Sequence, residues 1–213
     1  GLRVWVTHDP SPTRKLQYTW QIAEVGDYLI GANTAAPNRI VKALLEARVL
    51  PGFKRWKECT PEVKYGENSR VDFLLKDAKG LHYIEVKNCH LVYPDDRGYF
   101  PDSVSERASK HLRELIELRR QGHRASVIFT AKRTNVRCVR PSDVHDPVFA
   151  ETAREAAAAG VKFIALQIRP TEQALIVEKV IPADMKPYPT EKMTEWMQTN
   201  RAAAPAWQVV KKK

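Results

Sequence analysis

The 213-residue chain is 43% hydrophobic and 28% charged, a composition typical of a soluble globular protein. No run approaches the roughly 18 apolar residues needed to cross a bilayer, which excludes a membrane-spanning protein. The net charge of +10 and the pI near 9.6 favour a polyanionic partner, with a merely basic, well-hydrated surface as the alternative.

The first third of the chain predicts strands followed by a helix. Residues 1–6 alternate between apolar and polar positions, and residues 18–33 are typical of a hairpin that breaks near Gly26. Pro37 can open a helix, because its missing N–H has no partner to lose there. Apolar residues then recur at helical spacing as far as Val49, before Pro51 and Gly52 end the pattern.

The rest of the chain predicts an α/β core. Three strands are expected near 59–65, 71–76 and 82–88, followed by a loop around 94–98. We expect a helix over 103–122, with Ser103 as its cap and Glu106 completing a capping box. Asp146 reads as the N-cap of a further helix that ends near 159–160. The remaining predicted strands span 126–131, 162–168 and 174–180, and the proline-containing tail from 182 is expected to be extended or partly ordered.

The positive charge lies mainly in the predicted core. Residues 1–36 carry three basic and three acidic side chains, residues 37–181 carry 26 and 19, and residues 182–213 carry six and three. The three cysteines are far apart and odd in number, which suits a reducing cytosol better than a disulfide framework. With no basic-then-apolar signal segment at the start, the sequence predicts a cytoplasmic protein.

Two predicted neighbouring strands carry charged residues where charge is costly. Asp72 lies in VDFLL, while Glu85 and Lys87 lie in YIEVK and share one face of their strand. Two close carboxylates repel each other, and a divalent cation such as Mg²⁺, which prefers hard oxygen ligands, removes that cost. A lysine beside the cation can orient or help deprotonate a water, an arrangement suited to attack on a phosphodiester. The alternative is a salt bridge in which Lys87 neutralises Asp72 or Glu85.

Longer stretches of the sequence resemble a known family. The segments YGENSRVDFLL, YIEVKN, RGYFPDSVSERASKHLRELIEL and the later VHDPVF are similar to those of the sugar fermentation stimulation protein A family, over roughly residues 18–170. The resemblance implies a bacterial or archaeal cytoplasmic DNA-binding protein. It also implies an OB-fold module followed by a nuclease-like domain of the PD-(D/E)xK type, a restriction-endonuclease-like α/β fold with a mixed central sheet flanked by helices.

This resemblance divides the chain into a partial OB-fold module at 1–36, a nuclease-like domain at 37–181 and an extension at 182–213. Asp72, Glu85 and Lys87 fall where the motif of that superfamily would lie, with Mg²⁺ or Mn²⁺ as the implied cofactor. The chain departs from the pattern at Val71, where the motif has proline. It is also expected to start inside the OB module and to extend beyond the family at its C-terminal end.

Further acidic residues are weaker candidates. Nucleases of this superfamily often add an acidic ligand from an upstream element, a role open to Glu62, which could equally be a solvent-facing strand residue. Glu106 is expected to serve the capping box, Glu67 to be solvated, and Asp102 to be a helix-leading charge or to support a ligand. The six histidines show no spacing that argues for zinc.

Nucleic-acid contacts are expected from two sources. Aromatic side chains of the OB remnant, Trp5 and Trp20, could stack on bases or could be core residues. Basic residues around the 103–122 helix and the next strand could contact phosphates: Arg107, Lys110, His111, Arg119, Arg120, Arg124, Lys132 and Arg133. The first three could also form a hydrated helix face. No helix-turn-helix or zinc-finger signature is present, so binding is expected to be largely independent of DNA sequence.

The sequence therefore predicts a DNA-binding protein with a Mg²⁺-dependent, phosphodiester-hydrolysing centre, in which Asp72 and Glu85 bind metal and Lys87 positions water. The alternative is a DNA-binding regulator of sugar (maltose) metabolism genes whose nuclease-like centre is unused. A structural or adaptor protein without nucleic acid is a third hypothesis, which the charge balance disfavours. The oligomeric state is open, with a dimer possible.

Overall fold

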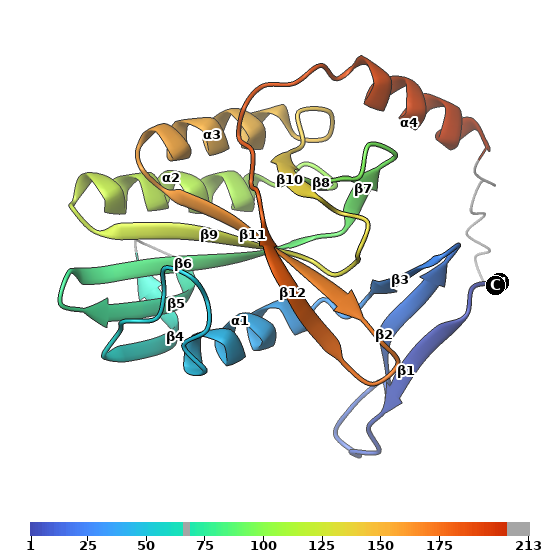
Figure 1. The fold of residues 1–213 in the computed structure, drawn as a ribbon, viewed down its shortest axis with the longest axis horizontal. Helices are drawn as coiled ribbons and strands as arrows, with labels where there is room; N and C mark the ends of the chain where they lie inside the picture. Colours follow the sequence, from blue (N-terminus) through green and yellow to red (C-terminus); the bar gives the residue numbers. More distant parts are fainter. Residues whose placement is uncertain (66–68, 204–213) are drawn as a thin grey trace, which may run out of the picture.

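A six-stranded mixed sheet forms the centre of the computed structural model, which describes residues 1–65 and 69–203 (Figure 1). Its strand order is β12-β11-β9-β6-β5-β4, and only the neighbours β6, β9 and β11 run parallel. The strands are β4 (Glu58–Tyr65), β5 (Ser69–Asp77), β6 (Gly80–Cys89), β9 (Arg124–Ala131), β11 (Lys162–Pro170) and β12 (Leu175–Ile181). The α/β core predicted from the sequence is confirmed. Glu67 lies outside the described residues.

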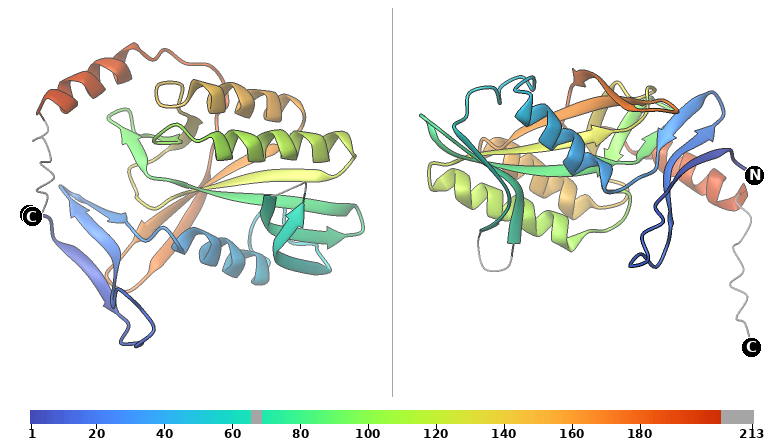
Figure 2. Two further views of the ribbon diagram at one scale, coloured as in Figure 1. Left: turned by 180° about the vertical axis from the view of Figure 1, so that it is seen from behind. Right: turned by 90° about the horizontal axis from the view of Figure 1, so that it is seen from below.

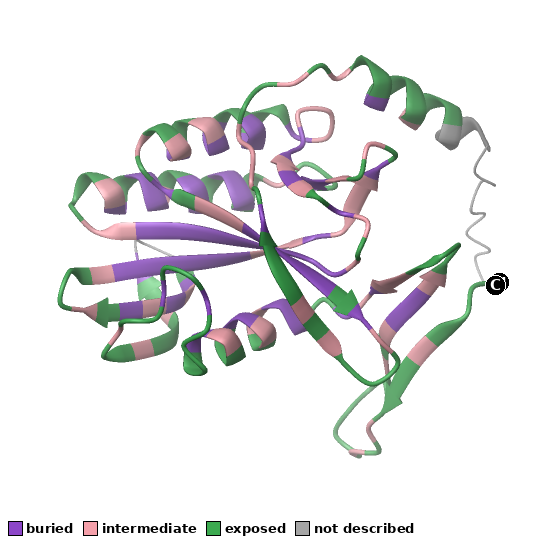
Figure 3. Cartoon of the chain, in the orientation of Figure 1, coloured by how far each residue is buried: buried purple, intermediate pink, exposed green. Residues whose placement is uncertain are grey.

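Helices cover both faces of this sheet. Helices α2 (Glu106–Arg120) and α3 (Pro147–Ala158) lie together on one face, and α1 (Ala36–Glu46) lies on the other (Figures 1 and 2). Alternate residues of β9 point to opposite faces, so Val127 and Phe129 join the core under α2 and α3, while Ile128 joins the core under α1. The central strands are accordingly buried along most of their length (Figure 3).

The N-terminal residues form a separate three-stranded antiparallel sheet. It comprises β1 (Val4–His8), β2 (Tyr18–Val25) and β3 (Tyr28–Gly31), and the predicted hairpin break falls at Gly26, whose φ is +57°. Lys132, directly after β9, ties this sheet to the core. Its carbonyl accepts from the Gly31 N–H at 2.8 Å, and its ammonium donates to the Asn33 carbonyl. The division of the chain into domains stays a prediction.

The start of α2 differs from the prediction. The cap is Ser105 and not Ser103: the Ser105 hydroxyl accepts from the Ala108 N–H at 3.2 Å. Glu106 is therefore the first helical residue, too early in the helix to complete a capping box. The sequence offers two serines two residues apart, and the contact that favours the second comes from outside the helix. Asp146 accepts the Ser105 N–H at 2.8 Å.

Asp146 is the N-cap of α3, as predicted, and it also fixes the start of α2. One carboxylate oxygen accepts from the Phe149 N–H at 2.9 Å, and the other accepts from Ser105. The residue is 2% exposed, so water cannot replace either bond. We expect Asp146→Ala to lower the free energy of unfolding by about 2 kcal/mol, the upper range for a lost cap. Denaturant melts measure this, and Asp143→Ala, which changes a partly exposed ion pair with Arg154, is the comparison expected to cost less.

One further prediction was wrong in detail, whereas the partial order expected of the tail is present. The expected loop around 94–98 is a hairpin of β7 (Leu91–Tyr93) and β8 (Arg97–Phe100), with β10 (Cys138–Pro141) parallel to β8. These strands are too short to show an alternating pattern. The tail contains α4 (Glu191–Ala203), from which Met193 packs against Tyr93 and Tyr99. In the part of the chain that is described, no helix has the length and apolar character of a membrane span.

Candidate functional site

Three adjacent strands bring Glu62, Asp72 and Glu85 into line. The register pairs Pro61 with Phe73 and Val63 with Val71, so Glu62 and Asp72 occupy opposing positions of β4 and β5. On the other side, Phe73 pairs with Ile84, and the same register continued by one residue sets Asp72 opposite Glu85. Directly opposed residues of antiparallel strands lie about 5 Å apart at their Cβ atoms. The sheet therefore collects the three predicted acidic ligands at one place.

The backbone is irregular at this place. Val71 packs in the core under α2, whereas Phe73 packs in the core under α1, although residues two apart in a regular strand share a face. Strand β5 therefore departs from regular alternation at Asp72. Glu62 has φ +55°, a left-handed conformation that costs a non-glycine residue about 1 kcal/mol. Such strained positions occur preferentially at functional sites.

Asp72 takes part in the sheet through its side chain. One oxygen accepts the backbone N–H of Val86 at 2.7 Å, and the other accepts from the Asn38 amide at 2.6 Å. The carboxylate thus bridges β6 and α1, two elements that follow and precede it in the chain. These two bonds hold its position without any cation.

Glu85 lies at the centre of a buried charged group. Its Oε1 accepts from Lys87 Nζ at 2.7 Å and from His111 Nδ1 at 2.6 Å. Glu85 is 3% exposed, and its Oε2 is buried without a hydrogen-bond partner among the described residues. An unpartnered buried carboxylate oxygen is costly and calls for a ligand or water. A salt bridge from Lys87 to Asp72 or Glu85 is the alternative to a metal site in the sequence prediction, and the structure contains such a pair between Lys87 and Glu85.

The two neighbouring carboxylates titrate in opposite directions. Burial and the nearby charge of Glu85 raise the pKa of Asp72 to about 6, against the hydrogen bonds from Val86 and Asn38. Burial also opposes ionisation of Glu85, but the bond from His111 and the charge of Lys87 outweigh it and hold its pKa below the ordinary value. Glu85 is therefore the firmly ionised member of the pair, and Asp72 is the one that would gain most from a cation.

A cavity opens onto these carboxylates. It has a volume of about 390 Å³ and is lined by Glu62, Ser69, Arg70, Asp72, Glu85, Arg107, Lys110 and His111. Exposed Arg107 and Lys110 from α2, with exposed Arg70 from β5, give the acidic floor a basic rim. The sequence prediction missed Arg70; its place two residues before Asp72 was the available signal. An anionic ligand with a bound cation would match this distribution of charge: the cation would face the acidic floor, and the anion would face the basic rim.

His111 has a different place from the one predicted. It is 5% exposed and bonded to Glu85, so it orients a carboxylate and does not reach a phosphate at the surface. Lys132 is 2% exposed and donates to Asn33, and burial lowers its pKa to about 8. Because its side chain is buried, Lys132 does not reach a phosphate at the surface either.

The other predicted basic residues are dispersed. Arg119 donates to the carbonyls of Ala159 and His123, and so closes the end of α2. That end is about 20 Å from Arg107, given 1.5 Å per helical residue. Arg120 is exposed and pairs with Glu117. Of the eight basic residues predicted to contact phosphates, Arg107, Lys110 and the buried His111 line the cavity, together with Arg70.

The remaining predicted contacts lie elsewhere. Arg124 pairs with Asp77 at 2.7 Å, and Arg133 donates to Asn135. Trp20 is 50% exposed on β2, with its indole N–H donating to the Ile22 carbonyl, while Trp5 is half-buried on β1. Trp20 thus offers an open face, on a sheet separate from the one that carries the acidic residues.

The donor chemistry at the cavity fits a hard divalent cation. Asp72 and Glu85 supply oxygen ligands, Glu62 lies opposite Asp72, and Glu85 Oε2 is unpartnered. Mg²⁺ commonly takes one or two carboxylates and keeps several waters, so it needs no complete protein cage. Within the described residues, no three His, Cys, Asp or Glu side chains already surround one point as a metal cluster. The residues present therefore fit an open Mg²⁺ site, in which a few carboxylate oxygens and several waters would complete the coordination.

Comparisons with known proteins agree on one family. The family model described as the sugar fermentation stimulation protein RE domain matches residues 35–174. A sugar fermentation stimulation protein homolog from Thioalkalivibrio sulfidiphilus is 39% identical over 186 residues, which cover 87% of this chain and 78% of that protein. A homolog from Geotalea uraniireducens is 41% identical over 165 residues, 78% of this chain and 71% of that protein.

A solved structure has the same fold. The chain is similar to Pyrococcus furiosus SfsA in complex with Ca²⁺, with a TM-score of 0.78 and 27% sequence identity. The match covers 85% of this chain and 77% of that one, so it includes the N-terminal sheet or the tail in part as well as the core.

Proposed function

Since the chain belongs to the sugar fermentation stimulation protein family, we propose that it is a cytoplasmic DNA-binding protein with a divalent-metal centre that hydrolyses phosphodiesters. The observation that carries this proposal is Glu85 Oε2, a buried carboxylate oxygen without a partner, beside Asp72, whose pKa is raised. The Ca²⁺ bound by the related Pyrococcus furiosus protein supports a divalent-cation site in this chain.

The acidic residues of the cavity, together with His111 and Lys87 beside them, each have a role in this proposal. Asp72 and Glu85 would hold Mg²⁺ or Mn²⁺, with Glu62 as a further acidic ligand, directly or through water. The bound ion would supply Lewis-acid stabilisation of charge on the phosphate and a more acidic water. Lys87, fixed on Glu85 at 2.7 Å, is placed to hold the attacking water, and His111 positions Glu85 from the opposite side.

DNA would approach over the basic rim. Arg70, Arg107 and Lys110 flank the acidic floor, so a phosphate between them would lie next to Asp72 and Glu85. Contacts of this kind position the backbone and read no bases. Exposed Arg120 and Trp20 are more distant candidates, which would extend the contact beyond the cavity.

Lys87→Met tests the chemical role separately from binding. We expect the parent to cleave DNA in Mg²⁺ or Mn²⁺ and to be inactive in EDTA, and the variant to lose at least about a hundredfold in rate, as for loss of a group that moves or holds a proton. DNA affinity in EDTA should change by less than about threefold, because Lys87 is only 13% exposed in its side chain. Lys110→Met is the comparison, since it should weaken binding first. A parent without any metal-dependent cleavage would contradict the enzymatic proposal.

Salt dependence tests the binding proposal. The logarithm of the affinity for duplex DNA should fall linearly with the logarithm of salt concentration, by about 0.9 per phosphate neutralised. Arg107→Gln should reduce this slope by about one and weaken different sequences equally. A flat salt response, or a preference of several orders of magnitude for one sequence, would contradict the proposal.

A non-catalytic DNA-binding regulator of sugar metabolism genes is the second candidate. The observation that favours it is that Glu85 Oε1 already has two partners within the protein, Lys87 and His111, of which Lys87 balances its charge. In this case DNA binding would show the same salt slope, and Mg²⁺ would leave the DNA intact.

A further inference from the structure

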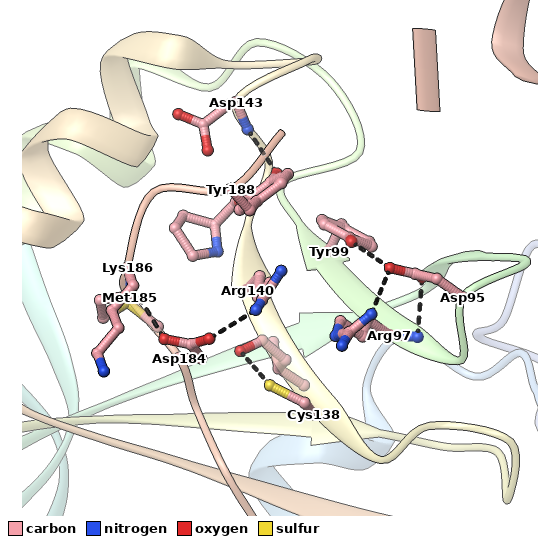
Figure 4. Close-up of polar contacts among 12 residues, drawn as sticks. Asp95, Arg97, Tyr99, Cys138, Arg140, Asp143, Asp184, Met185, Lys186 and Tyr188 are labelled. Atoms are coloured by element: carbon pink, nitrogen blue, oxygen red, sulfur yellow. Dashed lines mark hydrogen bonds and ion pairs between the residues drawn. The ribbon is translucent and has the colours of Figure 1, made fainter. Parts of the chain in front are cut away.

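A second cavity lies apart from the acidic one, between the β7–β8 hairpin, β10 and the start of α4. Its volume is about 720 Å³, within the range of small-ligand pockets. Tyr93, Tyr99 and Tyr188 form aromatic walls, and Trp196 stands edge-on to Tyr93 with ring centroids 5.3 Å apart. Tyr188 comes from the segment that leads into α4, so the cavity is built from parts of the chain far apart in sequence (Figure 4).

Two guanidinium groups lie in this cavity, and each is held by a carboxylate. Asp95 accepts from Arg97 Nη1 at 3.0 Å, and Asp184 accepts from Arg140 Nη2 at 2.7 Å (Figure 4). The Arg140 guanidinium lies 5.0 Å from the centre of the Tyr188 ring, and its Nε is buried without a hydrogen-bond partner among the described residues. Both groups are therefore pre-positioned, with donors beyond those the carboxylates use.

Exposed Lys192 adds a third basic side chain to the lining, and Glu191 adds a second carboxylate beside Asp95, so the lining keeps a small excess of positive charge. The lining thus combines aromatic faces with guanidinium and ammonium groups. A flat ring stacks on such faces, and a phosphate pairs with such cations. A nucleotide unit carries both features in one molecule, whereas a neutral ligand would leave Lys192 and the remaining guanidinium donors of Arg97 without a partner in the cavity.

The position of the cavity links it to the acidic site. Strand β6, which carries Glu85 and Lys87, ends at Cys89, and the chain reaches Tyr93 through β7. Tyr93 is six positions after Lys87 in the sequence, which is at most about 20 Å of extended chain. A single DNA strand of a few nucleotides can span such a distance while its backbone lies on the basic rim.

We propose that this aromatic cavity binds an unpaired nucleotide of a DNA strand whose phosphates lie at the acidic site. The base would lie among Tyr99, Tyr188 and Trp196, with its phosphate on Arg97 and Lys192. The inference rests on the proposed DNA-binding function and adds a substrate class to it: DNA with a single-stranded end or gap. Recognition would be tolerant of sequence, because every base offers a flat face for stacking.

Affinity for two DNAs tests the proposal. One is a blunt duplex, and the other is the same duplex with a single-stranded overhang of several nucleotides, each titrated by fluorescence anisotropy at one salt concentration in EDTA. We expect the parent to bind the overhang DNA at least about fivefold more tightly, the lower end of the effect of stacking one base on an aromatic side chain. Trp196→Ala should remove this difference and leave the blunt-duplex affinity unchanged.

The controls separate the cavity from general electrostatics. Lys192→Ala should reduce the overhang preference, while Lys179→Ala, the same change at an exposed position of β12, should leave it intact. Trp196 is 36% exposed and Lys192 is exposed, so both variants should fold, which melting curves check. If the parent binds both DNAs equally, the inference is overturned, because a pocket for a neutral small molecule would give that result. Binding of the blunt duplex would still uphold the proposed DNA-binding function. Binding of neither DNA overturns both.

Discussion

Asp72→Asn is expected to stabilise the metal-free protein at pH 7.5 and above. The folded-state pKa of Asp72 is about 6, compared with 3.8 for an unperturbed aspartate, so folding costs the ionised form about 3 kcal/mol. This shift already includes the favourable bonds from Val86 and Asn38. Asparagine removes the charge and can still accept from one partner and bond to the other. We therefore expect a gain of about 1–3 kcal/mol, or several degrees in melting temperature.

The pH dependence has a definite sign. A carboxyl whose pKa is raised on folding binds its proton more tightly in the folded state, so it opposes stability as pH rises from about 4 to 6. Below about pH 4 both states are protonated, and the parent and Asp72→Asn should melt alike. The gap should open through pH 6 and then stay constant. Thermal melts at intervals of pH measure this.

Mg²⁺ should reverse the order of the two proteins. A ligand that binds only the folded state stabilises it by about 2.7 kcal/mol at a hundredfold excess over its dissociation constant. The parent should therefore gain melting temperature in Mg²⁺, and Asp72→Asn should gain much less. Asp77→Asn is a matched control on the same strand: it removes the negative charge that pairs with Arg124, so it should be slightly destabilised and keep the Mg²⁺ response. A destabilised Asp72→Asn together with a Mg²⁺-indifferent parent would exclude the metal centre.

The sequence predicted the core elements because their signals are local. The helical spacing from Ile40 and the apolar run at 126–131 each depend on neighbours in the chain. The strand lies where expected, and the helix is present but ends at Glu46, before Val49. The two strand predictions place Asp72 and Glu85 on neighbouring strands. The break in alternation at Asp72, which sends Val71 and Phe73 into different cores, carries no signal in the sequence.

Other features depend on contacts between distant residues. Ser105 rather than Ser103 caps α2 because Asp146, 41 residues later, accepts the Ser105 N–H. His111 is bonded to Glu85 because α2 packs over β6, and no pattern within the helix distinguishes it from a hydrated histidine. Lys132 is buried by the N-terminal sheet, whose docking the sequence does not reveal. The short strands of the aromatic cavity were missed for the same reason.

Glu85→Gln should have the opposite effect to Asp72→Asn, although the two carboxylates are neighbours. The pKa of Glu85 is lowered on folding, so its ionised form stabilises the protein at pH values above its ordinary range, and this contribution is lost as pH falls through the folded-state pKa. Glutamine would leave Lys87 and His111, with side chains 13% and 6% exposed, without an anionic acceptor. We expect a loss of about 3 kcal/mol at pH 7.5, as for other buried pairs deprived of one partner.

The double variant Glu85→Gln with Lys87→Met identifies the cause of this loss. Removing both charges takes away the buried ammonium that Glu85→Gln leaves without its partner, and only His111 then lacks its anionic acceptor. Part of the stability lost in Glu85→Gln should therefore return, and the two changes should be clearly non-additive. The gap between parent and Glu85→Gln should also close in acid, where Glu85 is protonated. Neither variant should respond to Mg²⁺, because both lack the carboxylate that carries the unpartnered oxygen. If Glu85→Gln were as stable as the parent at pH 7.5, the buried ionic group would not contribute to folding. If it kept the full Mg²⁺ shift, Glu85 would not be a ligand, and the metal would have to lie elsewhere on the chain.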